Sequence, residues 1–382
     1  MKEKMHNKPK KRKNTWTQYL VTALWVLIGF VCGIAFVKYI RIPENNVTLY
    51  EALFYLCGLL LGMCVAIITQ LILHEAGHLI FGLLSGYRFS SFRLFNLILV
   101  NENGKLKLKR LEIAGTGGQC LMVPPDLKDG KIPFVFYNLG GALMNLIAGV
   151  IFICMYFLLR DIQLFSVVML LCAVVGFVFA ITNGVPMRTN TVDNDGYNTL
   201  ALARSKDAMR AFWIQLKVSE KISKDVRLKD MPEEWFAVPS DEAMQNSMIA
   251  VLGVFACSRL MDQQQFEKAN ELMAHMFDAD SNICGIHRNL LICDRIYIEL
   301  ITENRPEHLA ELFSKEQKKF MRQMQNFPSV LRTQYAYALL CEHDVAKAEQ
   351  IKTQFQKCAR VYPYPNEILS EKELMEIAKK HA

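Results

Sequence analysis

The stretch QLILHEAGHLIFGLLSG, residues 70–86, places two histidines and a glutamate inside one of the most apolar parts of the chain. A charged side chain at the centre of a bilayer costs roughly 2.5–3.5 kcal/mol on insertion scales. Such residues persist where they pair, face a cavity or bind something. His74, Glu75 and His78 therefore indicate a functional site within a membrane-spanning helix.

The three polar residues form the pattern H-E-x-x-H, which is typical of a zinc site. On a helix, residues four apart share one face, so His74 and His78 can bind one ion. Zinc suits two imidazoles, a carboxylate and one open position for water. Glu75 lies beside them and can accept a proton from water and deliver it to a leaving amine. The pattern also arises by chance in soluble helices, but the apolar surroundings favour Zn²⁺ as the cofactor and Glu75 as the catalytic base.

Apolar runs long enough to cross a bilayer, which takes about 20 residues, crowd the first half of the chain. They cover residues 19–40, 52–84, 132–159 and 164–182. Arg160 and Asp161 separate the last two, which are therefore predicted to form a tight helical hairpin. The second half has the composition of an ordinary soluble protein.

These patterns predict an α-helical polytopic membrane protein with about four transmembrane helices and three regions. The regions are a basic tail with a first anchor (1–48), a membrane core (49–197) and a helical cytosolic domain (198–382). The first anchor resembles a secretory signal in its basic start, but its apolar run is long and no A-x-A-like site ends it. We expect it to remain uncleaved.

Basic residues in the short loops predict the orientation of the spans. Residues 1–15 carry seven Lys/Arg and residues 85–132 carry eight, whereas the two other loops carry about one each, Arg41 and Arg160. The N-terminus and the C-terminal half should therefore face the cytoplasm. Along a helix entering near Glu51, His74 lies about 35 Å in, close to the cytoplasmic edge of the hydrocarbon layer. The basic tail needs no nucleic-acid partner to explain it.

A third metal ligand is expected after the fourth span, which returns to the same side of the membrane. Residues 181–198, ITNGVPMRTNTVDNDGYN, contain Asp193 and Asp195, followed by Gly196. Pro186 permits a break through which either carboxylate can turn back toward the histidines. Either aspartate can also be an Asx-type turn or a helix cap.

Together these motifs resemble the site-2 protease family of intramembrane zinc metalloproteases, peptidase family M50. H-E-x-x-H in one span is followed by Gly141-Ala-Leu-Met-Asn145 in the next, similar to the family's Gly-x-x-x-Asn. Asn183 and Pro186 match its Asn-x-x-Pro, and Asp195-Gly196 matches its Asp-Gly. Eight residues separate Pro186 from Asp195, and six separate Pro186 from Asp193, whereas the family usually has four. The spacing therefore leaves open which aspartate is the third metal ligand, and the glycine that follows Asp195 favours that residue.

The resemblance covers residues 50–198 and implies an intramembrane zinc metalloendopeptidase. It implies that His74, His78 and the aspartate bind the metal, that Glu75 activates water, and that Asn183 helps to place the substrate backbone. A capping role is the alternative for Asn183. The substrate would be a membrane-spanning or signal-peptide-like helix cleaved near the cytoplasmic face of a bacterial cell membrane.

Residues 88–123 are predicted to contain a small β-hairpin insertion. The strand-like runs 92–100 and 105–113 flank Asn-Glu-Asn-Gly, a turn signal. Site-2 proteases carry a similar hairpin that can hold an extended substrate as an added strand, which is one interpretation here. The other is a peripheral amphipathic hairpin with its lysines on lipid phosphates.

The C-terminal half is predicted to be all-α. The segments 266–277 and 345–357 carry apolar stripes typical of tetratricopeptide-like helix pairs, although their spacing fits no multiple of about 34 residues. Such pairs often bind a protein or peptide, and a solvated bundle without a partner is the alternative. The main functional alternative is a catalytically silent membrane scaffold that binds a partner through this domain.

Overall fold

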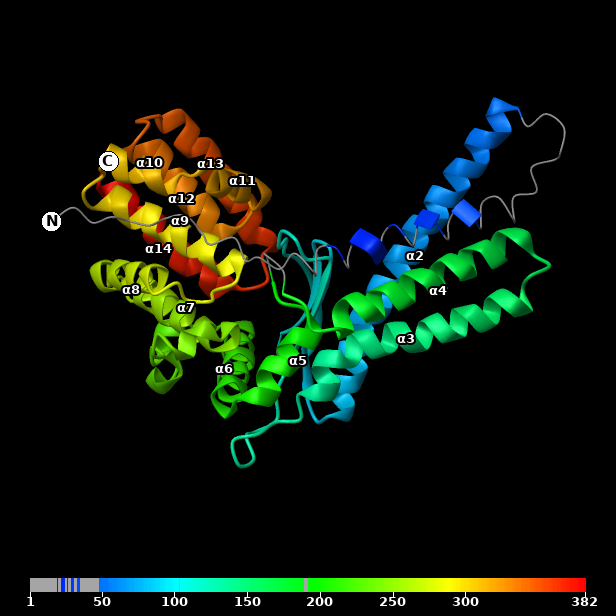
Figure 1. Ribbon diagram of the computed structural model, residues 1–382. Coiled ribbons are helices and arrows are strands. Elements are labelled where there is room, and N and C mark those ends of the chain that lie inside the picture. The colour runs from blue at the N-terminus through cyan, green and yellow to red at the C-terminus, as the bar shows by residue number, and fades with distance from the viewer. Residues whose placement is uncertain are drawn as a thin grey trace.

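The computed structural model describes residues 19, 22–24, 26, 29–30, 33–34, 48–102, 104–188 and 192–382. Most of the first predicted span, residues 19–40, and most of the predicted 1–48 region lie outside these residues. Figure 1 shows three long helices on one side, a small sheet in the middle and a helical C-terminal part on the other side. The protein is mostly helical, as expected from its sequence.

Three helices among the described residues are long and apolar enough to cross a membrane. They are α2 (Leu49–Leu84), α3 (Val135–Leu158) and α4 (Gln163–Gly184), and they match the runs predicted at 52–84, 132–159 and 164–182. The last two form the predicted hairpin, because only residues 159–162 connect them. The fold is consistent with a membrane protein.

Local signals in the sequence set both ends of α2. Thr48 begins the helix with a capping box, in which its side chain accepts from the Glu51 N–H and the Glu51 carboxylate accepts from the Thr48 N–H. Gly86 ends it with a positive φ of 86°, a conformation that favours glycine. The Tyr87 N–H then donates to the Gly82 carbonyl over 3.0 Å. The 36-residue helix is about 54 Å long, which carries the histidines to its C-terminal third.

Glycines let α3 approach the histidine-bearing part of α2 closely. A Cβ atom on Gly77 would overlap the Gly140 carbonyl, and a Cβ on Gly140 would overlap the Gly77 carbonyl. A Cβ on Gly141 would overlap the ring of His74. The small residues of the two motifs therefore place the α3 backbone directly against the histidine.

The segment between α2 and α3 forms a four-stranded antiparallel sheet in the order β3-β2-β1-β4. Its strands are β1 (Arg88–Leu94), β2 (Leu97–Glu102), β3 (Lys105–Arg110) and β4 (Gly118–Val123). The predicted hairpin exists as β2 and β3, paired from Leu97↔Arg110 to Glu102↔Lys105. It is one half of a larger sheet than we expected.

The predicted continuous strand at 92–100 is wrong, because it is two strands joined by a tight turn. Leu94 pairs with Leu97, and Phe95 in the turn has a positive φ of 53°. Phenylalanine rarely adopts this conformation, so Asn96, the second residue of the turn, is the only turn signal there. The chain reverses because β1 also pairs with β4, from Arg88↔Val123 to Leu94↔Gly118, which is a contact between distant residues.

The C-terminal part is helical throughout its regular structure. Its α-helices are α5 (Asp195–Arg204), α6 (Lys206–Ser223), α7 (Ser247–Asp262), α8 (Phe266–Asp278), α9 (Gly285–Ile301), α10 (Pro306–Leu312), α11 (Lys315–Gln323), α12 (Pro328–Leu340), α13 (Val345–Val361) and α14 (Pro365–Lys380). Three short 3-10 helices, Leu228–Asp230, Glu233–Phe236 and Ala243–Gln245, lie between α6 and α7. Ile98 and Val100 of β2 belong to the same buried apolar core as residues of α7 to α10 and α12 to α14, so the sheet packs on the helical part.

Candidate metal centre

Two histidines on successive turns of α2 face the same point. His74 is buried and His78 is partly buried, and their Nε2 atoms lie 3.3 Å apart. The two rings meet edge to face, with centroids 4.8 Å apart and an angle of 85° between their planes. This is the geometry expected of H-E-x-x-H on a regular helix.

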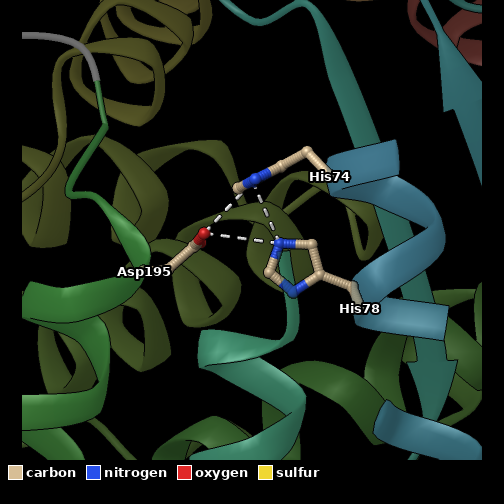
Figure 2. Close-up of side chains that lie close together, drawn as sticks. All are labelled: His74, His78 and Asp195. Atoms are coloured by element: carbon tan, nitrogen blue, oxygen red, sulfur yellow. Dashed lines mark hydrogen bonds and ion pairs between the residues drawn. The ribbon is translucent and has the colours of Figure 1, made fainter. Parts of the chain in front are cut away.

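Asp195, the first residue of α5, completes a triangle with the histidines (Figure 2). Its Oδ2 atom lies 3.2 Å from His74 Nε2 and 3.3 Å from His78 Nε2. Ligands held tetrahedrally at 2.0–2.1 Å from zinc lie about 3.3–3.4 Å from one another. The spacing of the three atoms therefore fits a zinc ion that these side chains would hold together.

Hydrogen bonds from the far side of each ring determine which nitrogen faces the triangle. His78 Nδ1 lies 2.8 Å from the Tyr137 carbonyl, which can only accept, so Nδ1 carries the proton. His74 Nδ1 lies 2.7 Å from Asn145 Oδ1. Asn145 Nδ2 donates to the Gln70 backbone carbonyl and to Gln70 Oε1, both over 2.8 Å, so its Oδ1 is the acceptor. In their neutral form both rings thus present an unprotonated Nε2 to Asp195.

Three electron-pair donors that face one another need a cation between them. Asp195 Oδ2 is buried and accepts no hydrogen bond from any described residue. Burial alone raises the pKa of the Asp195 carboxyl, but His78 and His74, when they are protonated and donate to it, outweigh burial and hold that pKa below its ordinary value. The carboxylate is therefore charged at neutral pH, and its surroundings fit a divalent metal. Among the described residues, this is the only group of three or more His, Cys, Asp or Glu side chains close enough to hold an ion.

Glu75 is buried beside the triangle and in contact with the sheet. It follows His74 on α2 and is 6 % exposed. A Cβ atom on Gly118, at the start of β4, would overlap the Glu75 carboxyl group, so only glycine leaves room there. The charge of Arg93 on β1 also acts on Glu75, and Arg93 Nη2 donates to the Gly118 carbonyl over 3.2 Å. The glutamate therefore lies where the sheet and the helix meet.

The two aspartates of the 181–198 segment have different surroundings. Asp193 Oδ2 accepts a hydrogen bond of 2.6 Å from Ser247 Oγ at the start of α7. Its Oδ1 lies 3.7 Å from Arg188 Nε. Only Asp195 reaches the histidines. Asn183 lies in the last turn of α4, where its Nδ2 donates to the Phe179 carbonyl over 3.0 Å, and it is not part of the triangle.

Asn194 closes the long connection between Pro186 and Asp195, and our sequence reasoning missed it. Its side chain makes four hydrogen bonds of 2.6–2.9 Å, donating to the carbonyls of Thr182 and Val185 and accepting from the N–H groups of Met187 and Tyr197. It also caps the N-terminus of α5. The bonds hold the end of α4 against the start of α5, so the extra residues do not displace Asp195. An Asn at the position before Asp-Gly was the only local signal.

Asn194→Ala is expected to lower zinc affinity by about 10–100-fold, the usual effect of removing a group that orients a ligand. The reason is that Asp195 would lose the bonds that fix its backbone. Zinc competition against a chelating dye, with the purified full-length protein, measures this. Asp344→Ala, which removes the N-cap of α13 far from the site, is the matched control and should bind zinc like the wild type. Equal zinc affinity in Asn194→Ala and the control would contradict a positioning role.

The groups that orient the histidines were only partly visible in the sequence. Asn145 is visible in the sequence as the end of the Gly-x-x-x-Asn motif. The Tyr137 contact is made by a backbone carbonyl, so no side-chain pattern can reveal it. Gln70, which fixes the Asn145 amide, itself donates to the Cys172 carbonyl of α4 over 2.8 Å. The network therefore joins α2, α3 and α4.

Comparison with known proteins finds one match to a family. Residues 52–217 match the family model described as peptidase M50B-like. No curated protein and no solved structure matches the chain. The matched region contains α2 to α5, and thus both histidines, Glu75 and Asp195. Over these residues, which make up less than half of the chain, the protein is therefore similar to the M50 family of membrane metalloproteases.

Proposed function

We propose that the protein is a zinc metalloendopeptidase that cleaves a peptide bond in or beside a membrane-spanning or signal-peptide-like helix. The observation that carries the proposal is the triangle of His74 Nε2, His78 Nε2 and Asp195 Oδ2, with edges of 3.2–3.3 Å, and a buried glutamate next to it. A binding protein has no need of that glutamate, whereas a hydrolase needs a base at this position.

His74, His78 and Asp195 would hold Zn²⁺, and Asn145 and the Tyr137 carbonyl would keep both imidazoles oriented. When bound, zinc would polarise the scissile carbonyl and lower the pKa of a water molecule. Glu75 would accept a proton from the attacking water and deliver it to the leaving amine as the peptide C–N bond breaks.

The substrate would have to be extended before it could react, because a peptide bond inside a helix is enclosed by its own hydrogen bonds. The sheet supports such a step, since Gly118 of β4 lies against Glu75 and a sheet can accept an added strand. Asn183, half-buried at the cytoplasmic end of α4, would help to orient the substrate backbone. Basic loops support cleavage near the cytoplasmic face of a bacterial cell membrane.

The helical part would be a cytoplasmic domain that binds a protein partner, and it would recruit the substrate or regulate its cleavage. Its support is the hydrogen bond between Ser247 of α7 and Asp193, two residues before the proposed ligand Asp195. A partner that moves α7 would therefore also move the segment that carries Asp195. No nucleic acid is required as a partner.

A catalytically silent scaffold of the same fold is the second candidate. The long spacing between Pro186 and Asp195 favours it, because a misplaced ligand would not hold zinc. The four hydrogen bonds of Asn194 weigh against it, since they draw the ends of that connection together.

Metal removal tests the proposed function directly. The full-length protein is co-reconstituted in nanodiscs with a tagged reporter that contains one signal-peptide-derived membrane helix. We expect about one zinc per chain by mass spectrometry, and cleavage that stops with 1,10-phenanthroline and returns with added zinc. A wild-type protein that binds no zinc, even after reconstitution, would favour the scaffold. Cleavage that continues in metal-free protein would contradict the metal mechanism.

A further inference from the structure

A cavity of about 240 Å³ lies inside the helical part, where α7, α9, α12 and α14 meet (Figure 1). This volume is well above the roughly 30 Å³ that one water molecule occupies. The walls are mainly apolar, but four carboxylates and two guanidinium groups also line them. These are the side chains of Asp262, Asp294, Glu367, Glu371, Arg227 and Arg332. Because acidic groups outnumber basic ones, we call this space the acidic cavity.

Both guanidinium groups of the acidic cavity are already paired. Arg227 lies 2.6 Å from Asp262 and also pairs with a second carboxylate, which lies outside the cavity. Arg332 Nε donates to Glu371 over 2.9 Å, and Arg332 Nη2 donates to Asp294. Each guanidinium group thus already serves two carboxylates.

Glu367 forms an ion pair with no positively charged side chain among the described residues. Its Oε2 atom accepts a hydrogen bond of 2.8 Å from the Tyr362 hydroxyl group. Burial and the nearby charge of Glu371 raise the pKa of the Glu367 carboxyl to about 7. A cation close to this carboxyl would lower its pKa instead. Glu367 is only partly buried, so a positively charged group that enters the cavity can reach it.

The acidic cavity also contains a buried donor without an acceptor. Arg332 is 1 % exposed, and its Nη1 atom donates to no described residue. A buried N–H group without an acceptor is costly, so Nη1 indicates a ligand atom that accepts a hydrogen bond. A lysine or arginine residue within a peptide supplies both a cation and a carbonyl oxygen. The apolar walls suit the aliphatic part of such a side chain.

The acidic cavity is connected to the sheet beside the proposed metal centre. Tyr364 precedes α14, the helix that carries Glu367, and its side chain is hydrogen-bonded to that of Ser91 on β1. The charge of Arg93, on the same strand, acts on both Tyr364 and Glu75. The segment that lines the cavity therefore contacts the strand that lies next to the proposed catalytic base.

We propose that the acidic cavity binds a lysine or arginine side chain from the basic cytosolic segment that borders the membrane-spanning helix of a substrate. The positive group would pair with Glu367 and Glu371, and a neighbouring peptide carbonyl would accept from Arg332 Nη1. Cytoplasmic loops of membrane proteins are rich in Lys and Arg, and signal peptides begin with a basic region. The identity of the occupant as a substrate rests on the proposed function, whereas the binding of a basic peptide does not.

Peptide binding to the full-length protein tests the cavity. The probe is a fluorescent peptide with three lysines separated by glycine and alanine, and its analogue has glutamine in place of each lysine. Fluorescence anisotropy is measured at pH 8, where Glu367 is ionised, in nanodiscs of phosphatidylcholine, which carries no net charge. We expect the lysine peptide to bind at least about tenfold more tightly than its analogue, and Glu367→Gln to weaken its binding by about 10–100-fold. Glu376→Gln, at an exposed position on α14, is the matched control and should bind like the wild type.

Thermal unfolding followed by circular dichroism separates a loss of binding from a loss of fold. Glutamine can accept the Tyr362 hydrogen bond and removes an unbalanced charge, so Glu367→Gln should melt at or above the wild-type temperature at pH 8. Equal affinity for the lysine peptide in Glu367→Gln and Glu376→Gln would overturn the site. Equal affinity of the wild type for both peptides would overturn it without any variant. Spermidine that competes as strongly as unlabelled lysine peptide would overturn a peptide as the occupant.

Reporter cleavage in nanodiscs tests whether the occupant is the substrate. Replacing the lysines at the cytosolic end of the reporter with glutamine should raise the KM of the wild type by about tenfold and leave kcat unchanged. The KM of Glu367→Gln should not depend on these lysines. An equal effect of the lysines in both proteins would overturn recruitment through the cavity and leave the proposed protease function intact. Peptide binding as expected, with a reporter that is never cleaved, would support the cavity and contradict the proposed function.

Discussion

Glu75→Gln is expected to slow peptide-bond hydrolysis by about 10²–10⁴-fold, the usual contribution of general acid–base catalysis. Glutamine has nearly the same shape as glutamate, so it should fit beside Gly118 as Glu75 does. It cannot accept the proton of the attacking water. Because Glu75 contributes no atom to the triangle, zinc should remain at about one per chain.

Reporter cleavage in nanodiscs and zinc content by mass spectrometry measure the two effects separately. Glu112→Gln, at an exposed position beyond β3, is the matched control and should cleave at the wild-type rate. Wild-type cleavage by Glu75→Gln would exclude Glu75 as the base. Loss of both zinc and cleavage would show instead that Glu75 supports the metal site. An inactive variant that keeps zinc could then serve as a trap for natural substrates.

Asp195→Ala is expected to lower zinc affinity by more than about 100-fold, because it removes one of three protein ligands. Asp193→Ala should keep zinc affinity near the wild-type value. Asp193→Ala should instead lower the free energy of unfolding by about 1–3 kcal/mol, because Ser247 and nearby Arg188 lose their partner. The two variants remove the same chemical group two residues apart, so each is the control for the other.

Competition between the protein and a chelating dye gives the zinc affinity, and circular dichroism shows whether each variant keeps its helices. Zinc loss in Asp193→Ala with retention in Asp195→Ala would reverse the ligand assignment. Zinc loss in both, with helices intact, would mean that the whole connection from Pro186 to Asp195 must be ordered before the metal binds. Retention in both would remove the aspartates from the site.

The membrane helices could be predicted from the sequence because their cause is local. A span needs only a sufficient run of apolar residues, and each run at 52–84, 132–159 and 164–182 contains its own signal. The position of His78 one turn after His74 is equally local, since the helix repeat alone brings them to one face. The predicted turn at residues 101–104 was found for the same reason.

The sheet was only partly predicted, because its order depends on distant residues. β1 and β4 pair across residues 95–117, and the turn at Phe95 carries no glycine or asparagine at its positive φ. The strand propensity of residues 92–100 therefore predicted one long strand, whereas the pairing with β4 divides this segment into β1 and β2. The faces of the sheet follow from the same pairing, so they became visible only in the fold.

For the proposed site, the sequence alone determined the helix that carries His74, Glu75 and His78, and it limited the third ligand to two aspartates. Tertiary structure decided which aspartate meets the histidines and which nitrogen each ring presents. The physical reason is that both depend on contacts between different helices. The Asn194 bonds join α4 to α5, and Asn145 and the Tyr137 carbonyl reach from α3 to α2. A spacing in the chain cannot encode such contacts.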